Sequence, residues 1–221
     1  MSNEQNTEKT PAPEKKSSGR LHAAGERTVT WLCTCAMLIA LEIVLNRFLS
    51  INTMGWKIGF AFIPPMLAAM LYGPGTSALV WALADLLGAL LFPIGPYHPG
   101  FTICNAIMGF NLGVMLHPDP LHLQIGGGNL TFSVGLHWEK IKLYNILIPV
   151  LVNCLAVGLV INTYWVSTLY GSKTYWGWFL YRLPEYLVMV PVQVILAPVL
   201  LQLTRILKKT GLAGRSAGKR G

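Results

Sequence analysis

Six apolar segments occupy most of this 221-residue chain and leave little room for a water-soluble domain. They cover approximately residues 29–48, 59–72, 76–92, 101–116, 143–170 and 183–207. Hydrophobic residues make up 53% of the sequence and charged residues only 12%, against about 25% charged residues in an ordinary soluble domain. The sequence therefore predicts an all-α integral membrane bundle of six transmembrane helices.

The second and third segments are shorter than the roughly 20 residues that a helix needs to cross a bilayer. They form either short or tilted helices or a re-entrant pair, and both alternatives return the chain to the same side. Lys and Arg residues cluster before the first segment and at the end of the last one. Because such residues accumulate on the cytoplasmic side, we expect a multi-pass protein of the bacterial cell membrane with both termini cytoplasmic.

The two ends of the chain differ in composition from the part between them. Residues 1–27 are rich in Glu, Lys, Ser and Pro, which predicts a disordered cytoplasmic tail. Residues 28–207 are expected to form the membrane domain, with an extended cytoplasmic loop at about 117–142, and residues 208–221 a basic cytoplasmic tail. The net charge of +8 follows from the positive-inside bias, so no nucleic-acid partner is expected.

The segment from Pro93 to Thr102 interrupts the apolar sequence with proline, glycine and aromatic residues. Proline fixes φ and glycine permits positive φ, so the segment predicts a stiff, irregular turn at the outer membrane surface. Its side chains Tyr97, His98 and Phe101 would then be held in fixed positions. We interpret this turn as part of a ligand pocket.

Charged residues lie at the same expected outer face. Arg47 ends the first segment, Lys57 precedes the second, and Arg182 precedes Pro184 at the expected first turn of the last helix. These cations either bind a ligand carboxylate or extend to lipid headgroups. Asp85 either accepts hydrogen bonds from the amino edge of a heterocycle or pairs internally, because an isolated carboxylate is costly in a bilayer.

Three further features each concern one or two residues. Glu42, deeper in the first segment, is expected to make an interhelical hydrogen bond. Asn162 and Trp165 lie about one helical turn apart, so an amide and a stacking face can act on one ligand. On the first helix, Ala36 and Ala40 place two small side chains on one stripe, which allows another helix to approach closely.

Catalytic and cofactor motifs are weak in this sequence. The segment from His117 through Asp119 to His122 is a possible metal loop, but its two prolines prevent a helical ligand face. The glycine run at 126–128 lacks the lysine and hydroxyl of a phosphate-binding loop. We therefore expect no cofactor, no metal and no enzyme activity.

Taken together, these motifs resemble the substrate-binding S components of energy-coupling factor (ECF) vitamin transporters, and within them the folate group. The resemblance extends from about Val29 to Leu207. It rests on Ala36-x-x-x-Ala40, Lys57-Ile-Gly-Phe-Ala-Phe-Ile-Pro64, Leu71-Tyr-Gly-Pro74, Ala84-Asp85-Leu-Leu-Gly88, Gly95-Pro-Tyr-His-Pro-Gly-Phe-Thr102, Asn162-Thr-Tyr-Trp165, Arg182-Leu-Pro184 and Pro191-Val-Gln193.

The resemblance implies a six-helix bundle that captures a vitamin at its outer face. It further implies docking, through Ala36 and Ala40, onto a transmembrane coupling subunit that is driven by two ATPase subunits. Folate carries a pterin, an aminobenzoyl ring and a glutamate, so its site needs aromatic faces, polar partners and cations. The expected apolar contacts are Tyr97, His98, Phe101 and Trp165; the heterocycle partners are Asp85, Asn105 and Asn162; the carboxylate partners are Arg47, Lys57 and Arg182.

Three alternatives remain open at this point. The ligand of an S component can be another vitamin, such as riboflavin, thiamine, pantothenate or a pyridoxine-like ring. The chain can instead be a membrane enzyme that uses the metal loop, or a structural membrane adaptor without a small ligand.

Overall fold

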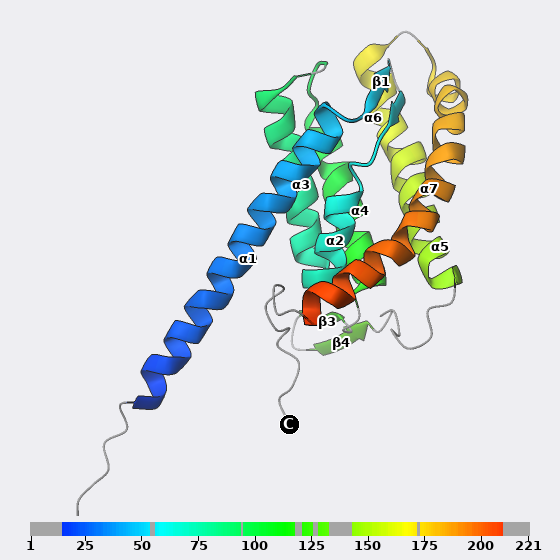
Figure 1. Cartoon of the computed structure of the whole chain (residues 1–221). Helices are drawn as coiled ribbons and strands as arrows, with labels where there is room; N and C mark the ends of the chain where they lie inside the picture. The colour runs from blue at the N-terminus through cyan, green and yellow to red at the C-terminus, as the bar shows by residue number, and fades with distance from the viewer. Residues whose placement is uncertain are drawn as a thin grey trace, which may run out of the picture.

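The computed structural model of the chain describes residues 15–53, 56–93, 95–117, 121–125, 128–132, 143–171 and 173–209. Within these ranges the helices form six rods (Figure 1). They are α1 (Lys15–Arg47), α2 (Ile63–Tyr72), α3 (Pro74–Leu91), α4 (Pro99–Leu116), the continuous helix of α5 (Leu143–Leu151), η1 (Val152–Ile161) and α6 (Asn162–Tyr170), and α7 (Tyr175–Lys209).

Two short antiparallel hairpins join the rods. The strands β1 (Ile51–Thr53) and β2 (Trp56–Ile58) connect α1 to α2, and Ile51 pairs with Ile58. The strands β3 (Leu121–Ile125) and β4 (Gly128–Phe132) lie within the long loop expected at 117–142. Figure 1 shows the two hairpins at opposite ends of the bundle, with the start of α1 and the end of α7 at the end that carries β3 and β4.

The helical membrane bundle expected from the sequence is confirmed. Among the described residues, five stretches of helix are long and apolar enough to cross a membrane, and α2 is shorter. Many large apolar side chains face outward, as lipid contact requires; Leu90, Leu187 and Ile195 are 67%, 68% and 69% exposed. The short helix α2 is instead surrounded by protein, since residues 64–71 are all buried.

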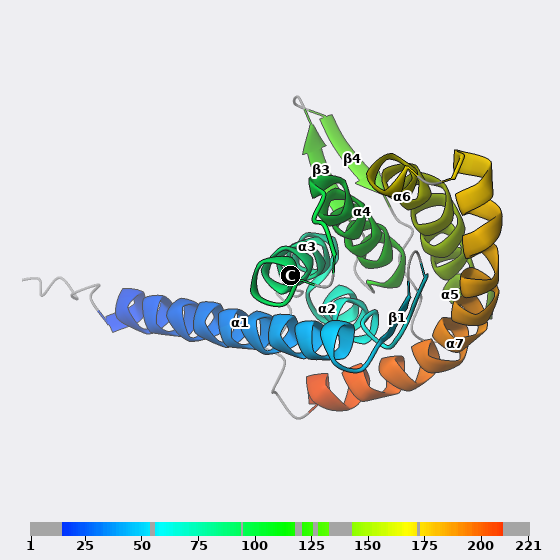
Figure 2. The ribbon, with the colours of Figure 1, turned by 90° about the horizontal axis from the view of Figure 1, so that it is seen from above.

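Two helices begin earlier than predicted. Helix α1 begins at Lys15, so residues 15–27, which were expected to be disordered, continue its helical backbone; alanine, arginine, glutamate and leucine within this stretch favour helix. Helix α7 begins at Tyr175 and contains Pro184, Pro191 and Pro198. The prediction that Pro184 lies in its first turn is therefore wrong. Figure 2 shows α7 bending around the other helices, as expected for a helix with internal prolines.

Close backbone contacts fix α2, α3 and α4 as one unit. Gly73 separates α2 from α3 with a φ of 88°, a backbone conformation that residues with a Cβ atom rarely adopt. Helix α4 then packs directly against the start of α3. A Cβ atom at Gly109 would lie 2.6 Å from the carbonyl oxygen of Ser77, and one at Gly113 would overlap the Cα of Pro74. This unit forms one wall of the cavity described below.

The contact between α4 and α3 makes a testable prediction about stability. Replacing Gly113 by alanine forces backbone apart, so we expect Gly113→Ala to lower the melting temperature of the detergent-purified chain and to cost about 1–3 kcal/mol. The matched control is Gly75→Ala, because no atom lies within 4 Å of a Cβ at that helical position. Equal melting temperatures for the two variants would contradict this packing.

Candidate functional site

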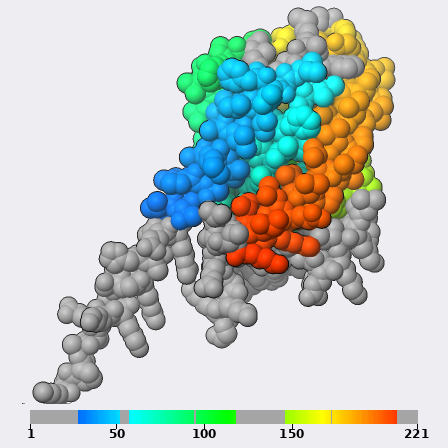
Figure 3. All heavy atoms as spheres, in the orientation of Figure 1, coloured from blue at the N-terminus to red at the C-terminus, as the bar shows by residue number. Residues whose placement is uncertain are grey.

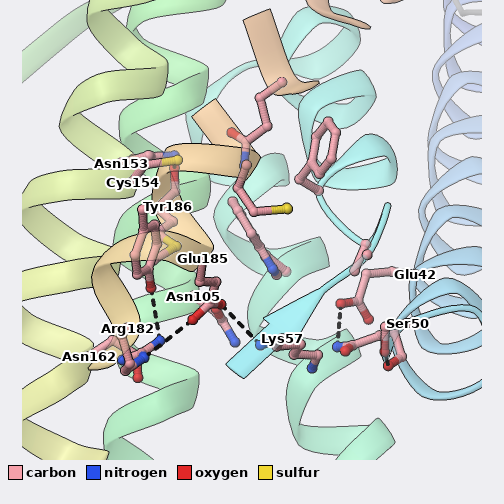
Figure 4. A pocket seen from close by; sticks show the side chains of 18 residues that line it. Glu42, Ser50, Lys57, Asn105, Asn153, Cys154, Asn162, Arg182, Glu185 and Tyr186 are labelled. Atoms are coloured by element: carbon pink, nitrogen blue, oxygen red, sulfur yellow. Dashed lines mark hydrogen bonds and ion pairs between the residues drawn. The ribbon is translucent and has the colours of Figure 1, made fainter. Parts of the chain in front are cut away.

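A polar cavity lies inside the apolar bundle, near the end that carries the β1–β2 hairpin (Figure 4). Its walls come from α1, β2, α3, α4, η1, α6 and α7 and from the turn that leads into α2. The polar and charged side chains that line it are Glu42, Asn46, Ser50, Lys57, Asn105, Asn153, Asn162, Arg182, Glu185, Tyr186 and Gln193. Because such groups are costly in a membrane interior, their concentration marks a functional site.

Arg182 and Glu185 form the charged wall on α7. Arg182 Nε lies 3.5 Å from Glu185 Oε2, and both side chains are 6% exposed. The guanidinium also donates from Nη1 to Thr163 Oγ1 at 3.1 Å and from Nη2 to the hydroxyl of Tyr186 at 2.9 Å. Glu185 Oε1 accepts a 3.2 Å bond from the backbone N–H of Lys57. This last bond connects the β1–β2 hairpin to α7.

Glu42 and Asn46 form the facing wall on α1. Asn46 Nδ2 donates to Glu42 Oε1 at 2.8 Å. The interhelical bond predicted for Glu42 is wrong, because Asn46, its hydrogen-bond partner among the described residues, lies one turn further along the same helix. Glu42 has no exposed surface and Asn46 is 4% exposed.

Several buried polar atoms around the cavity lack a hydrogen-bond partner within the part of the chain that the structure describes. They are Glu42 Oε2, Asn46 Oδ1, Asn162 Oδ1, Arg182 Nε and Glu185 Oε2. A buried polar atom without a partner costs about 1–3 kcal/mol. Arg182 Nε and Glu185 Oε2 still face each other as an ion pair, so Glu42 Oε2, Asn46 Oδ1 and Asn162 Oδ1 are the groups that a polar ligand can satisfy.

Lys57 places a cation on the hairpin side of the cavity. It lies on β2, outside the candidate membrane spans. Burial lowers the pKa of Lys57, and the positive charge of Arg47 lowers it further, whereas Glu42, Asp85 and Glu185 act in the opposite direction. The ammonium group is thus surrounded by both signs of charge, and its protonation responds to an added anion.

The structure brings four of the ten predicted binding residues to the cavity: Lys57, Asn105, Asn162 and Arg182. Arg47 lies beside α3, where its Nε would be 3.0 Å from a Cβ atom at Gly88. The remaining predicted residues lie in and around the turn between α3 and α4.

That turn is held by ring stacking and a helix cap. His98 stacks on Trp165 with ring centroids 4.8 Å apart, and Phe101 meets His98 edge-on at 6.2 Å. His98 Nδ1 accepts a 3.0 Å bond from the N–H of Gly100, which caps α4. A Cβ atom at Gly100 would overlap the Trp165 ring, so this close contact requires glycine.

A chain of hydrogen bonds secures the same turn on its other side. Asp85 Oδ2 accepts a 2.7 Å bond from the hydroxyl of Thr102, which lies 2.8 Å from the hydroxyl of Tyr97. Of the two alternatives for Asp85, the structure displays the internal pair. The turn is therefore held by contacts on both sides, while the stiffness expected from its proline and glycine content stays a prediction.

Sequence reasoning did not assign the acids and amides of the inner walls to the site. The missed residues are Glu42, Asn46, Ser50, Asn153, Glu185, Tyr186 and Gln193. Part of the signal was present, because Arg182, Glu185, Tyr186 and Gln193 follow helical spacing along one face of α7. Asn153 carried no such signal; it lies in the π-helical segment η1, and π-helical turns occur often at functional sites.

No cluster of metal-binding side chains is present among the described residues. Asp119, in the possible metal loop, lies outside these residues, and so do the side chains of its neighbours up to residue 145.

Comparison with known proteins identifies relatives of this chain. Residues 31–201 match the model of the ECF transporter substrate-specific component. The folate transporter FolT of Clostridium novyi (strain NT) is 33% identical over 160 residues, which cover 72% of this chain and 81% of that protein. The folate transporter FolT of Leuconostoc mesenteroides subsp. mesenteroides is 28% identical over 165 residues, or 72% of this chain and 77% of the relative.

A solved structure agrees with these relatives. The crystal structure of FolT bound with folic acid matches with a TM-score of 0.63 and 26% identity, over 76% of this chain and 90% of that chain. The resemblance inferred from the sequence motifs is thereby confirmed. Because the family model spans most of the chain and the fold agrees, this chain belongs to the family of ECF transporter substrate-specific components.

Proposed function

We propose that this chain is the high-affinity folate-binding S component of an ECF-type ABC importer. It captures folate at the outer face and delivers it through a coupling subunit and two separate ATPase subunits. The observation that supports a ligand most directly is the cavity lined by Glu42, Asn46 and Asn162, each of which has a buried oxygen without a hydrogen-bond partner among the described residues. Two curated relatives are folate transporters, and a structure of FolT contains folic acid, which favours folate over the other vitamins.

The cavity has the chemistry that folate requires. Lys57 and Arg182 provide cations for the glutamate carboxylates, with Arg47 as a third cation beyond the cavity. Asn105 and Asn162 provide amides for the heterocycle edge. Asp85, Tyr97, His98, Phe101 and Trp165 would form the outer wall over the bound ligand.

The arrangement of the helix ends supports an outward-facing site. The start of α1 and the end of α7 lie at the end of the bundle opposite the β1–β2 hairpin (Figure 1). Basic residues at both termini favour the cytoplasmic side for that end. The cavity would then open to the exterior of the cell membrane.

The proposed docking surface for the coupling subunit is the exposed face of α1 around Ala36 and Ala40. Both alanines are exposed, and Figure 3 shows α1 uncovered along one face of the molecule. Small side chains let a second helix approach closely within a membrane, where packing rather than water exclusion drives association.

Binding of folate is tested by titration of the detergent-purified chain with a panel of vitamins. A ligand that binds only the folded state raises the melting temperature. We expect folate to raise it, and riboflavin, thiamine, pantothenate and pyridoxine to leave it unchanged. A shift with one of these four vitamins and none with folate would refute the proposed ligand.

Folate affinity should depend on the protonation of Lys57. The pKa of Lys57 is lowered from 10.5 by burial, so the lysine loses its charge at a lower pH than an exposed lysine does. Because an anionic ligand binds the charged form, we expect affinity to be full below this pKa and to fall as pH rises through it. Isothermal titration over a series of pH values measures this fall.

Two variants control for other titrating groups. Lys57→Arg keeps its charge and should flatten this fall. At a pH below the pKa of Lys57, Lys57→Met should weaken binding by about tenfold, equal to about 1.4 kcal/mol. An unchanged pH profile in Lys57→Arg would show that another group causes the fall.

If the chain docks through α1, a change on this face should block assembly with the coupling subunit without changing folate binding. Replacing both Ala36 and Ala40 by tryptophan should leave folate affinity within about twofold and abolish copurification with the coupling subunit, because bulk prevents close helix approach. Ile195→Trp, on the exposed face of α7, is the matched control and should still assemble. Normal assembly of the double variant would exclude this face.

A further inference from the structure

Glu42 and Asn46 present two unpaired acceptors to the cavity. The amide group of Asn46 donates to Glu42 Oε1, and the remaining oxygens, Glu42 Oε2 and Asn46 Oδ1, have no hydrogen-bond partner in the described chain. The orientation of the amide follows from chemistry, because a carboxylate offers only acceptors and the NH₂ group must face it. The carbonyl oxygen of Asn46 is therefore left free beside the free carboxylate oxygen.

Within the described residues Glu42 forms no ion pair at contact distance, although the charge of Lys57 acts on it. Glu185 pairs with Arg182 and also accepts from the backbone of Lys57, so both of its oxygens face protein groups. Glu42, by contrast, has no exposed surface and a single hydrogen bond. A buried carboxylate with so few partners is costly, and a ligand with N–H donors would offset that cost.

The two free oxygens select the chemistry of their partner. They lie on side chains four residues apart, which share one face of α1. A matching ligand edge carries an N–H and an amino group on adjacent ring atoms. The 2-amino-4-oxopyrimidine half of a pterin has this edge, whereas a pyrimidinedione ring has no amino group.

We infer that Glu42 and Asn46 are the specificity-determining pair that reads the N3–H and 2-amino edge of the pterin ring. This inference rests on the proposed folate function and deepens it by assigning one end of the ligand to the α1 wall. The glutamate end then lies toward Arg182 on the α7 wall, whereas the Lys57 side chain extends toward the Glu42 side of the cavity (Figure 4). A site built to accept these donors rejects an analogue that lacks one of them, because a buried oxygen is left unpaired.

The test compares folate with 2-desamino-2-methylfolate, which keeps the ring and the glutamate but lacks the 2-amino donor. Dissociation constants are measured by titration of the detergent-purified full chain. We expect the wild-type chain to prefer folate by at least tenfold. Glu42→Gln should reduce this preference to less than threefold, since the charge-assisted acceptor is lost. Asn46→Ala should also reduce the preference for folate over the 2-desamino analogue.

Glu185→Gln is the matched control, because it makes the same chemical change in the opposite wall. It should weaken the binding of both compounds by a similar factor and keep the preference for folate. The preference is the ratio of two dissociation constants measured on the same variant. A partial loss of folded protein affects both constants equally and cancels in this ratio. If Glu42→Gln does not fold, the wild-type preference and Asn46→Ala still decide the question.

Equal affinity of the wild-type chain for both compounds would overturn the inference. A wild-type preference that persists in Glu42→Gln or, where that variant does not fold, in Asn46→Ala would also overturn it. These outcomes leave folate binding intact and so differ from failure of the proposed function. A wild-type chain that binds neither compound would refute the folate proposal, and this inference with it.

Discussion

The need to pair charge inside an apolar bundle governs the architecture around the cavity. Arg182 and Glu185 lie within a helix that crosses the membrane region, and each is almost fully buried. Their ion pair, the bonds of Arg182 to Thr163 and Tyr186, and the bond from the backbone of Lys57 to Glu185 connect α6, α7 and β2. A single polar network thus holds the hairpin against the bundle, and the shape of the site depends on it.

The opposite side of the site is rigid for a different reason. Helix α4 approaches the start of α3 at Gly109 and Gly113 so closely that side chains would not fit, and Gly73 takes a positive φ between α2 and α3. Ring stacking of His98 on Trp165 then connects the start of α4 to α6. The cavity therefore lies between a unit fixed by backbone contact and a set of helices fixed by polar bonds, and both are needed to hold ligand groups in place.

The charges near the cavity favour the proposed anionic ligand with a donor edge. Lys57 feels the fields of Arg47, Glu42, Asp85 and Glu185, so cations and anions are mixed around it. A ligand that bears carboxylates at one end and N–H donors at the other can meet both signs of charge without leaving either unpaired. Folate has this polarity, and an uncharged vitamin does not.

The sequence by itself determined the membrane bundle, its apolar segments and the family, because hydrophobic length and short motifs are local properties. It also predicted the stiff turn before α4, where proline and glycine act on their own backbone. It did not determine where α7 begins or which partner Glu42 bonds, and it gave Asp85 two alternatives. Only the tertiary structure decided these points, since a buried polar side chain takes the partner that packing places beside it, and sequence spacing does not specify contacts between helices.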